Sequence, residues 1–154
     1  MANEIDLRLA ALGIDLPTPP APAANYVPTV TTGKLVFVSG QVPMTAEGVK
    51  FVGKLGRDFS IEEGRQAARL CAINILGALK AALGDLGRIS RVVKVVGFVN
   101  AVPDFTEPHK CVNGCSDLLT DVFGEKGKHS RSAIGVGTLP LGAAVEVEAI
   151  AELT

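Results

Sequence analysis

Charged and aromatic side chains are scarce in this sequence. Only 20% of the 154 residues are charged, the formal net charge is −1, and there is no tryptophan and a single tyrosine. Proteins that bind nucleic acids usually carry a basic patch, and those that bind single strands add aromatic side chains on which bases stack. We therefore expect no nucleic acid among the partners of this protein. No polybasic run suited to an anionic membrane surface is present either.

The sequence also lacks the segments that direct proteins to membranes or out of the cell. The N-terminal stretch MANEIDLRLAALGIDLPTPP begins with acidic residues and has no basic region followed by a long apolar core. No run of about 18 apolar residues is free of polar interruptions, so no membrane-spanning helix is expected. The three cysteines are an odd number and make no disulfide framework, which fits a cytoplasmic protein with reduced thiols.

The chain length fits one folded domain preceded by a short arm. A chain of 154 residues can bury most of its apolar surface, and 47% of the residues are hydrophobic. Residues 3–13 predict a short amphipathic helix with Ile5, Leu9 and Leu12 on one side. The following stretch, DLPTPPAPAANYVP, holds five of the nine prolines and predicts an extended segment packed on the body. We place the arm at residues 1–23 and the main domain at residues 24–154.

The main domain has an order of elements that is typical of an α+β fold. β-branched residues predict strands, and apolar residues at helical spacing that end at a glycine predict helices. The predicted elements are two strands around a turn at Thr32-Gly33, a helix over 61–83, a strand over 90–102, a helix from Thr106 to Phe123, and strands over 130–137 and 143–153. The order β-β-α-β-α-β-β predicts a mixed sheet covered on one face by two helices.

The second face of this sheet needs a cover that the chain does not supply. The runs KLVFVSG and RVVKVVGFV are nearly continuous apolar stretches, whereas a strand with one wet face alternates apolar and polar residues. No further element of adequate size remains in the chain. We therefore expect another copy of the chain to cover this face in a homo-oligomer.

Four stretches of the main domain resemble one known protein family in their order and spacing. They are NYVPTV, FVSGQVP, SRVVKVVGFV and the C-terminal SRSAIGVGTLP with VEVEAIA. Together they resemble the RidA family, also called YjgF or L-PSP endoribonuclease-like, over about residues 24–153. The resemblance implies a chorismate-mutase-like α+β fold and a homotrimer whose sheets form a central barrel with ligand clefts between subunits. It implies no cofactor.

The same resemblance implies a reaction and a set of site residues. Studied members of the family hydrolyse enamines and imines such as 2-aminoacrylate and 2-iminobutanoate to 2-oxo acids and ammonia. By position, Arg131 matches the arginine that binds the substrate carboxylate, and Glu146 matches the glutamate that holds the attacking water. The positions that match substrate-binding residues are Tyr26, Ser39, Gly40, Asn113 and Ala133.

The residue types suit this chemistry. The planar guanidinium of arginine binds a carboxylate through two parallel hydrogen bonds, and a carboxylate can position water and transfer protons. With one Leu-Pro reversal between them, we expect Arg131 and Glu146 to meet on neighbouring strands. Plainer interpretations stay open for each residue. Arg131 can be an ion-paired surface residue, Glu146 and Glu148 part of a solvated face, Tyr26 an anchor for the arm, and Ser39 a turn hydroxyl bonded to the backbone.

The sequence departs from the family pattern beside the arginine. Ala133 stands where the deaminases often have cysteine, which affects the expected substrate preference, and His129-Ser130 replaces small residues or proline. His129 is either a solvated loop residue or a titratable group at the mouth of the cleft. No metal site is expected from His109, Cys111 and Cys115, because a tetrahedral site needs further ligands and Cys115 falls on an apolar helix stripe.

Three functions remain to be separated. The first is hydrolysis of a small carboxylated enamine or imine in clefts between subunits. The second is a non-catalytic trimer that binds a 2-oxo acid or a related small carboxylate metabolite. The third is the RNA cleavage of the older family label, which the near-neutral charge and scarce aromatics disfavour.

Overall fold

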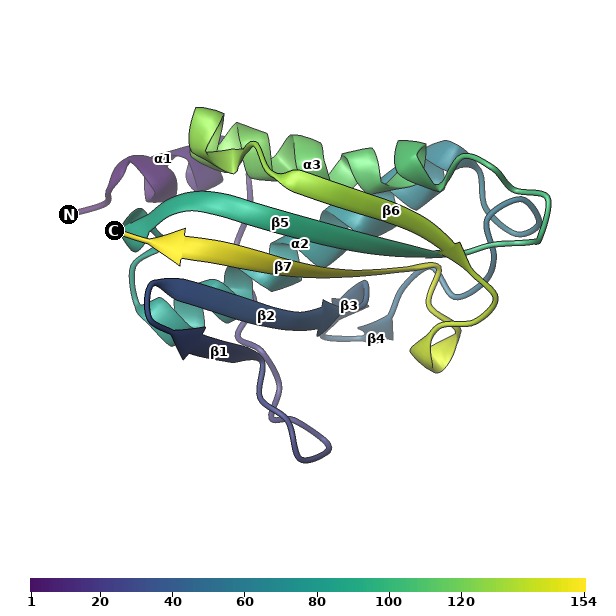
Figure 1. Cartoon of the computed structure of the whole chain (residues 1–154), viewed down its shortest axis with the longest axis horizontal. Coiled ribbons are helices and arrows are strands. Elements are labelled where there is room, and N and C mark those ends of the chain that lie inside the picture. The colour runs from purple at the N-terminus through teal and green to yellow at the C-terminus, as the bar shows by residue number, and fades with distance from the viewer.

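The computed structural model describes all residues, 1–154, and has the predicted succession of main elements. Figure 1 shows a single sheet with the two long helices on one side of it. The elements are α1 (Glu4–Ala11), β1 (Thr29–Thr32), β2 (Leu35–Gln41), β3 (Met44–Thr45), β4 (Gly48–Val49), α2 (Ile61–Leu83), β5 (Ile89–Asn100), α3 (Pro108–Phe123), β6 (Ser130–Val136) and β7 (Val145–Leu153). Three single turns of 3₁₀ helix are η1 (Leu86–Arg88), η2 (Gly124–Gly127) and η3 (Pro140–Gly142).

The main sheet is mixed, as predicted, with the strand order β1-β2-β7-β5-β6. β6 runs parallel to β5, and the other neighbouring strands are antiparallel. β5 therefore lies between β6 and β7, although β6 and β7 follow one another in the sequence. The short β3–β4 hairpin forms a separate two-stranded sheet that the sequence patterns did not predict.

The two long helices pack on one face of the sheet and on each other. Ser60 caps α2 through a reciprocal pair of hydrogen bonds with Glu63, and Pro108 occupies the first turn of α3, where no donor is lost. A Cβ on Gly114 of α3 would lie 2.0 Å from the carbonyl oxygen of Arg65 in α2, so a glycine is needed where the helices touch. By length and composition alone α2 passes as a membrane span, but 56% of its apolar 18-residue window is buried in the protein, as is common for central helices of folded domains.

The N-terminal arm packs on the helices as expected. Asn3 caps α1, and Leu9 and Ile14 are buried. Arg8 donates a hydrogen bond to the carbonyl oxygen of Val122 at the end of α3. The expectation that Leu12 shares the buried side of this helix is wrong, because Leu12 follows the last turn of α1 and is exposed.

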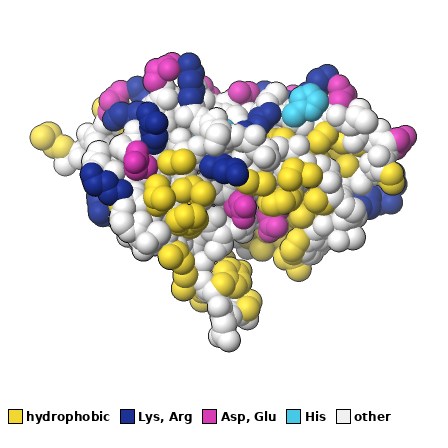
Figure 2. All heavy atoms as spheres, in the orientation of Figure 1, with side chains coloured by type: hydrophobic (Ala, Val, Ile, Leu, Met, Phe, Trp, Pro, Cys, Tyr) yellow, Lys and Arg dark blue, Asp and Glu magenta, His cyan; other side chains and the backbone are white.

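The other face of the sheet is open and largely apolar in this single chain. Figure 2 shows hydrophobic side chains gathered over this face around a few charged ones. Val30, Phe37 and Ile134 on it are 40–53% exposed. A hollow of about 360 Å³ lies across β1, β2, β7 and β5 and has Lys94 and Glu148 in its lining. The expectation that another copy covers this face stays a prediction.

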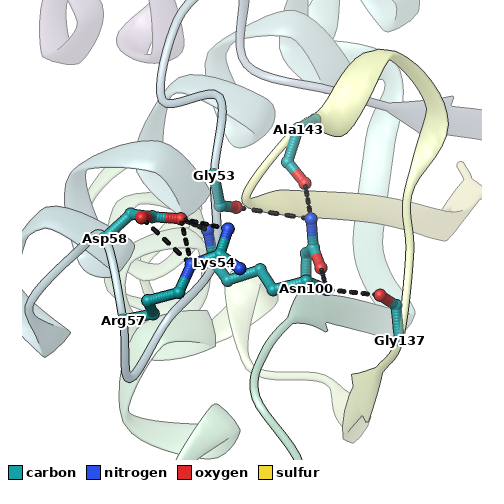
Figure 3. Close-up of polar contacts among 7 residues, drawn as sticks. All are labelled: Gly53, Lys54, Arg57, Asp58, Asn100, Gly137 and Ala143. Carbon is teal, nitrogen blue, oxygen red and sulfur yellow. Dashed lines mark hydrogen bonds and ion pairs between the residues drawn. The ribbon is translucent and has the colours of Figure 1, made fainter.

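A buried polar cluster fixes the end of β5 (Figure 3). Asn100 is 4% exposed, and its amide donates to the carbonyl oxygens of Gly53 and Ala143, at 3.3 and 3.2 Å. The Lys54 ammonium donates to the Asn100 side-chain oxygen at 2.6 Å and also to the carbonyl oxygen of Gly137. Every polar atom of the Asn100 amide is thus satisfied, which a buried amide requires. The cluster ties two loops, the β4–α2 and β6–β7 connections, to the sheet next to the start of β7.

Candidate functional site

The seven predicted site residues fall into two groups on opposite faces of the sheet. The first group is Arg131, Asn113 and Ala133, and the second is Tyr26, Ser39, Gly40 and Glu146. The register explains the separation. Arg131 pairs with Val95 on the face covered by the helices, whereas Glu146 pairs with Phe98 on the open face.

Arg131 lies at the edge of the sheet, where its side chain reaches α3. Its Nη1 donates to Asn113 Oδ1 at 2.8 Å and to Ser116 Oγ at 3.1 Å, and its Nη2 makes a longer contact of 3.4 Å with the carbonyl oxygen of His109. The guanidinium forms no ion pair with any carboxylate of the chain. The interpretation as an ion-paired surface residue is therefore wrong. Nη1 is anchored by two side-chain oxygens, while the rest of the guanidinium retains donors for an anion.

His129 supports the hydrogen bond between Ser116 and Arg131. Its Nδ1 lies 2.6 Å from the carbonyl oxygen of Gly127, which can only accept, so Nδ1 carries the proton. Its Nε2 lies 2.9 Å from Ser116 Oγ, whose hydroxyl donates to it and accepts from Arg131. Burial and the nearby Arg131 charge lower the pKa of His129, outweighing the opposing effect of the Gly127 bond, and this favours the neutral ring. The interpretation of His129 as a solvated loop residue is wrong.

Ala133 lies on the same face of β6 as Arg131, two residues further along. It pairs with Gly97 of β5 and packs, partly buried, against the hydrophobic core. Because Ala133 stands where the deaminases often have cysteine, β6 carries a small apolar side chain on the same face as the guanidinium. β6 therefore carries no thiol at this position.

Glu146 lies on the open face of β7 and packs against β2. A Cβ on Gly40 would come within 2.9 Å of Glu146 Cδ, so the carboxyl group rests directly on the Gly40 backbone. Burial, and secondarily repulsion from Glu148, raise the pKa of Glu146. A carboxylate with a raised pKa is a better proton acceptor at neutral pH than an exposed one. The interpretation of Glu146 as part of a fully solvated face is wrong, although it holds for the exposed Glu148.

Ser39 precedes Gly40 on β2, and Tyr26 lies in the segment before β1. The Ser39 hydroxyl donates to the carbonyl oxygen of Val27 at 2.7 Å, as the interpretation of a hydroxyl bonded to nearby backbone predicted. Tyr26 is 58% exposed and lines the same open cavity as Gly40.

The expectation that Arg131 and Glu146 meet on neighbouring strands is wrong. β5 separates β6 from β7, and the two side chains point to opposite faces. A side chain cannot reach through the hydrogen-bonded backbone of a sheet, so Arg131 and Glu146 of one chain cannot contact the same small molecule. Any site that uses both must combine two chains.

The three cysteines do not contribute a nucleophile. All three are buried, and burial raises the pKa of Cys111 to about 11 and that of Cys115 to about 12. The prediction that Cys115 is a buried small hydrophobic residue is confirmed. These thiols stay protonated at neutral pH, and the protonated form is a poor nucleophile and metal ligand.

Sequence reasoning missed Ser116 and Asn74. Ser116 follows Asn113 by three residues, so both lie on one side of α3, and this spacing was a usable signal. Asn74 is a buried polar residue within the apolar run LCAINILGAL of α2, which is a signal of the same kind.

The chain matches one family of known proteins over nearly its whole length. The sequence profile of the family described as "YjgF/chorismate_mutase-like, putative endoribonuclease" matches residues 6–153. The chain belongs to this family. The resemblance noted from the motifs and the expected chorismate-mutase-like fold are therefore confirmed for the chain as a YjgF/RidA-family member.

The proteins similar to this chain carry different functional descriptions. Protein TCP17 of Trypanosoma cruzi is 48% identical over 153 residues, which cover 99% of this chain and 96% of TCP17. The 2-iminobutanoate/2-iminopropanoate deaminase of Dermatophagoides farinae is 31% identical over 138 residues, 89% of this chain and 92% of its own length. Among solved structures, Atu1372 of Agrobacterium tumefaciens, of unknown function, has a TM-score of 0.90 and 47% identity, with 97% of this chain and 94% of Atu1372 covered. A Shewanella oneidensis protein that is described as an endoribonuclease has a TM-score of 0.94 and 36% identity, with 98% of this chain and 100% of that chain covered.

Proposed function

We propose that this protein hydrolyses carboxylated imines to 2-oxo acids and ammonia, in clefts where Arg131 of one subunit faces Glu146 of the next. The observation that carries the proposal is the guanidinium of Arg131, which is held in place on one side and has no anionic partner. A relative 31% identical to this chain is named as a 2-iminobutanoate/2-iminopropanoate deaminase, which supports the same reaction.

The first role is to bind the substrate carboxylate. Asn113 and Ser116 hold Nη1 of Arg131, so little side-chain freedom remains to be lost on binding. Partial burial strengthens the attraction between the guanidinium and a small anion. The side chain of Ala133 on the same face leaves room beside the bound carboxylate.

The second role is to direct water at the imine carbon. Glu146 accepts a proton from water as the oxygen bonds to C2, and the imine nitrogen takes up a proton. Glu146 then moves the hydroxyl proton of the resulting carbinolamine to its amino group, which leaves as ammonia, so a C=N bond is replaced by a C=O bond without any oxidation or reduction. The raised pKa of Glu146 suits a group that takes and returns a proton near neutral pH.

Assembly of the site needs more than one chain, because Arg131 and Glu146 point to opposite faces. The open, apolar face of the sheet supports association through this face. We propose a homotrimer, in which sheet faces pack together and each cleft combines the edge strand β6 of one subunit with β2 and β7 of its neighbour.

The first experiment measures hydrolysis of 2-iminobutanoate generated in the assay. The wild type should accelerate formation of 2-oxobutanoate, while Arg131→Lys should raise KM about tenfold or more and Glu146→Gln should lower kcat about a hundredfold. Binding of 2-oxobutanoate without any acceleration by the wild type would instead support a non-catalytic metabolite-binding protein.

The second experiment tests the shared site. Arg131→Ala and Glu146→Gln proteins are unfolded together, mixed in equal amounts and refolded. If each site takes its arginine and its glutamate from different subunits, about one quarter of the sites regain both wild-type groups, by random assortment in a closed ring. Activity that stays at the level of the separate variants, in a mixture whose subunits have exchanged, contradicts the shared site.

A further inference from the structure

A second feature of the chain lies beside Glu146 and is made by the N-terminal arm. An open cavity of about 650 Å³ separates the arm from the end of β2 and the β3–β4 hairpin. Four arm prolines, Pro17, Pro19, Pro20 and Pro22, form one wall, and Met44 and Ala46 belong to the opposite one. The cavity is large enough for a side chain with an aromatic ring.

The wall of this cavity is fixed at both ends. A Cβ on Gly77 of α2 would lie 2.5 Å from the carbonyl oxygen of Pro17, so the beginning of the wall rests on the helix backbone. At the other end, the Ser39 amide donates to the carbonyl oxygen of Pro28 at 2.9 Å, and the Ser39 hydroxyl donates to that of Val27. Prolines restrict the segment between these anchors. The cavity is therefore formed before any ligand arrives.

Asn74 offers the cavity a hydrogen-bond acceptor of fixed orientation. Asn74 is 8% exposed, and its amide nitrogen donates to the carbonyl oxygens of Val42 and Met44, each at 3.0 Å. These bonds fix the orientation of the amide. Its Oδ1 accepts no hydrogen bond from the chain and is not a buried, unsatisfied atom, so it is accessible in the cavity that Asn74 lines. Together with the polar side chains of Thr18, Gln41 and Thr45 in the lining, this acceptor favours a ligand that brings a donor to it.

The cavity adjoins the proposed catalytic carboxylate. Tyr26 and Gly40 both line it, and Gly40 is also the residue on which the Glu146 carboxyl group rests. The cavity and the Glu146 carboxyl group are therefore neighbours on either side of Gly40. Gly40 pairs with no residue of β1 or β7, so a substrate whose imine carbon faces Glu146 can extend its side chain past this residue into the cavity.

We propose that the cavity receives the side chain of a 2-imino acid that is large and mostly apolar, with a hydroxyl or N–H donor at its far end that reaches Asn74. This inference rests on the proposed function and specifies its substrate class. The side chain of 2-aminoacrylate is a single methylene group and leaves the cavity to water, whereas an aromatic side chain buries its apolar surface there. Burial of such a ring strengthens binding about tenfold or more.

The test compares three 2-oxo acids, which are the products of the reaction, by titration calorimetry. They are pyruvate, 3-phenyl-2-oxopropanoate and 3-(4-hydroxyphenyl)-2-oxopropanoate. We expect the phenyl compound to bind about tenfold more tightly than pyruvate, and the hydroxyl group to add about a further threefold through Asn74. The same order is expected for kcat/KM with the corresponding imines.

Two variants separate the cavity from the rest of the site. Ala46→Phe fills the cavity and should abolish the preference for the aromatic compounds while pyruvate binding is unchanged. Ala10→Phe makes the same substitution on an exposed position of α1, outside the cavity, and should keep the preference. If Ala46→Phe fails to fold, a crystal of the wild type soaked with the hydroxyphenyl compound gives the answer through the position of the ring.

The outcomes distinguish this inference from the proposed function. If none of the three compounds binds, the proposed function fails together with the cavity assignment. If pyruvate binds as tightly as the aromatic compounds, or the assembled protein fills the cavity with a neighbouring subunit, the cavity assignment alone is overturned.

Discussion

Gly40→Ala tests the position of the Glu146 carboxylate with the addition of one methyl group. The new Cβ would lie 2.9 Å from Cδ, 3.1 Å from Oε2 and 3.2 Å from Cγ of Glu146. Non-bonded carbon atoms approach to about 3.5–4.0 Å, so the carboxylate must withdraw by roughly 0.6–1 Å. Gly40 lies in the irregular part of β2 between Val38 and Gln41 but does not have a positive φ, so alanine itself brings no left-handed backbone strain.

Such a displacement should reduce catalysis much more than stability. A misplacement of about 1 Å of a catalytic group costs up to about a hundredfold in rate, so we expect kcat/KM for 2-iminobutanoate to fall about tenfold to a hundredfold. Because the Glu146 side chain can swing aside, the free energy of unfolding should change by less than about 1 kcal/mol. Steady-state kinetics and urea unfolding of the same preparation measure both quantities.

Gly135→Ala on β6 is the matched control, because a Cβ there meets no atom within 4 Å. It should leave both activity and stability near wild type. If Gly40→Ala keeps full activity while Glu146→Gln loses it, the contact between Gly40 and the catalytic carboxylate is not as described. If neither variant loses activity, Glu146 is not the catalytic group.

Three further predictions concern stability. Burial and Glu148 raise the pKa of Glu146, so its ionised form destabilises the fold; Glu146→Gln should therefore raise the Tm of thermal unfolding at pH 7, and this gain should vanish as acidification protonates the wild-type group, whereas an unchanged or lower Tm at pH 7 would contradict the assignment. The pKa of His129 is lowered in the folded protein, so its contribution to the free energy of unfolding is complete above the unfolded-state pKa of about 6.5 and is lost as the pH falls through the folded-state pKa. Urea unfolding at several pH values should therefore show a flatter dependence of stability on pH for His129→Gln than for the wild type. Identical pH profiles would refute the assignment of a neutral His129. Gly114→Ala forces a Cβ to within 2.0 Å of the Arg65 carbonyl oxygen and should cost about 3 kcal/mol in denaturant unfolding, whereas an unchanged midpoint would mean that α2 and α3 can separate freely.

The main elements were predictable because each repeats a local pattern over many residues. The apolar positions of α2 recur at helical spacing over 23 residues, and β-branched residues make up half of the 12 residues of β5. The β3–β4 hairpin has two residues per strand, which is too short for any periodicity to be visible. Leu12 was misassigned because the helix ends one residue before it, and helix ends are the least certain part of such predictions.

The identities of the site residues came from the family motifs, but their arrangement did not. The arginine and the glutamate are separated by one reversal in the sequence, which suggests a hairpin. The chain instead places β6 parallel to β5 and β7 on the far side of β5. Strand order depends on long-range contacts that no local pattern encodes, and a register shift of one residue moves every side chain of a strand to the other face. The role of His129 was hidden for the same reason, since Ser116 meets it only after α3 has packed on β6.

The double anchoring of the proline-rich wall makes its length adjustable. Because Pro17 and Pro28 are each held by the body, residues inserted between them lengthen a closed loop, and doubling such a loop costs only about 0.6 kcal/mol. Evolution can thus enlarge or shrink the space beside the catalytic carboxylate through insertions and deletions, without altering any strand or helix. Libraries that vary only the number of residues between the two anchors are a direct way to engineer selectivity in this protein.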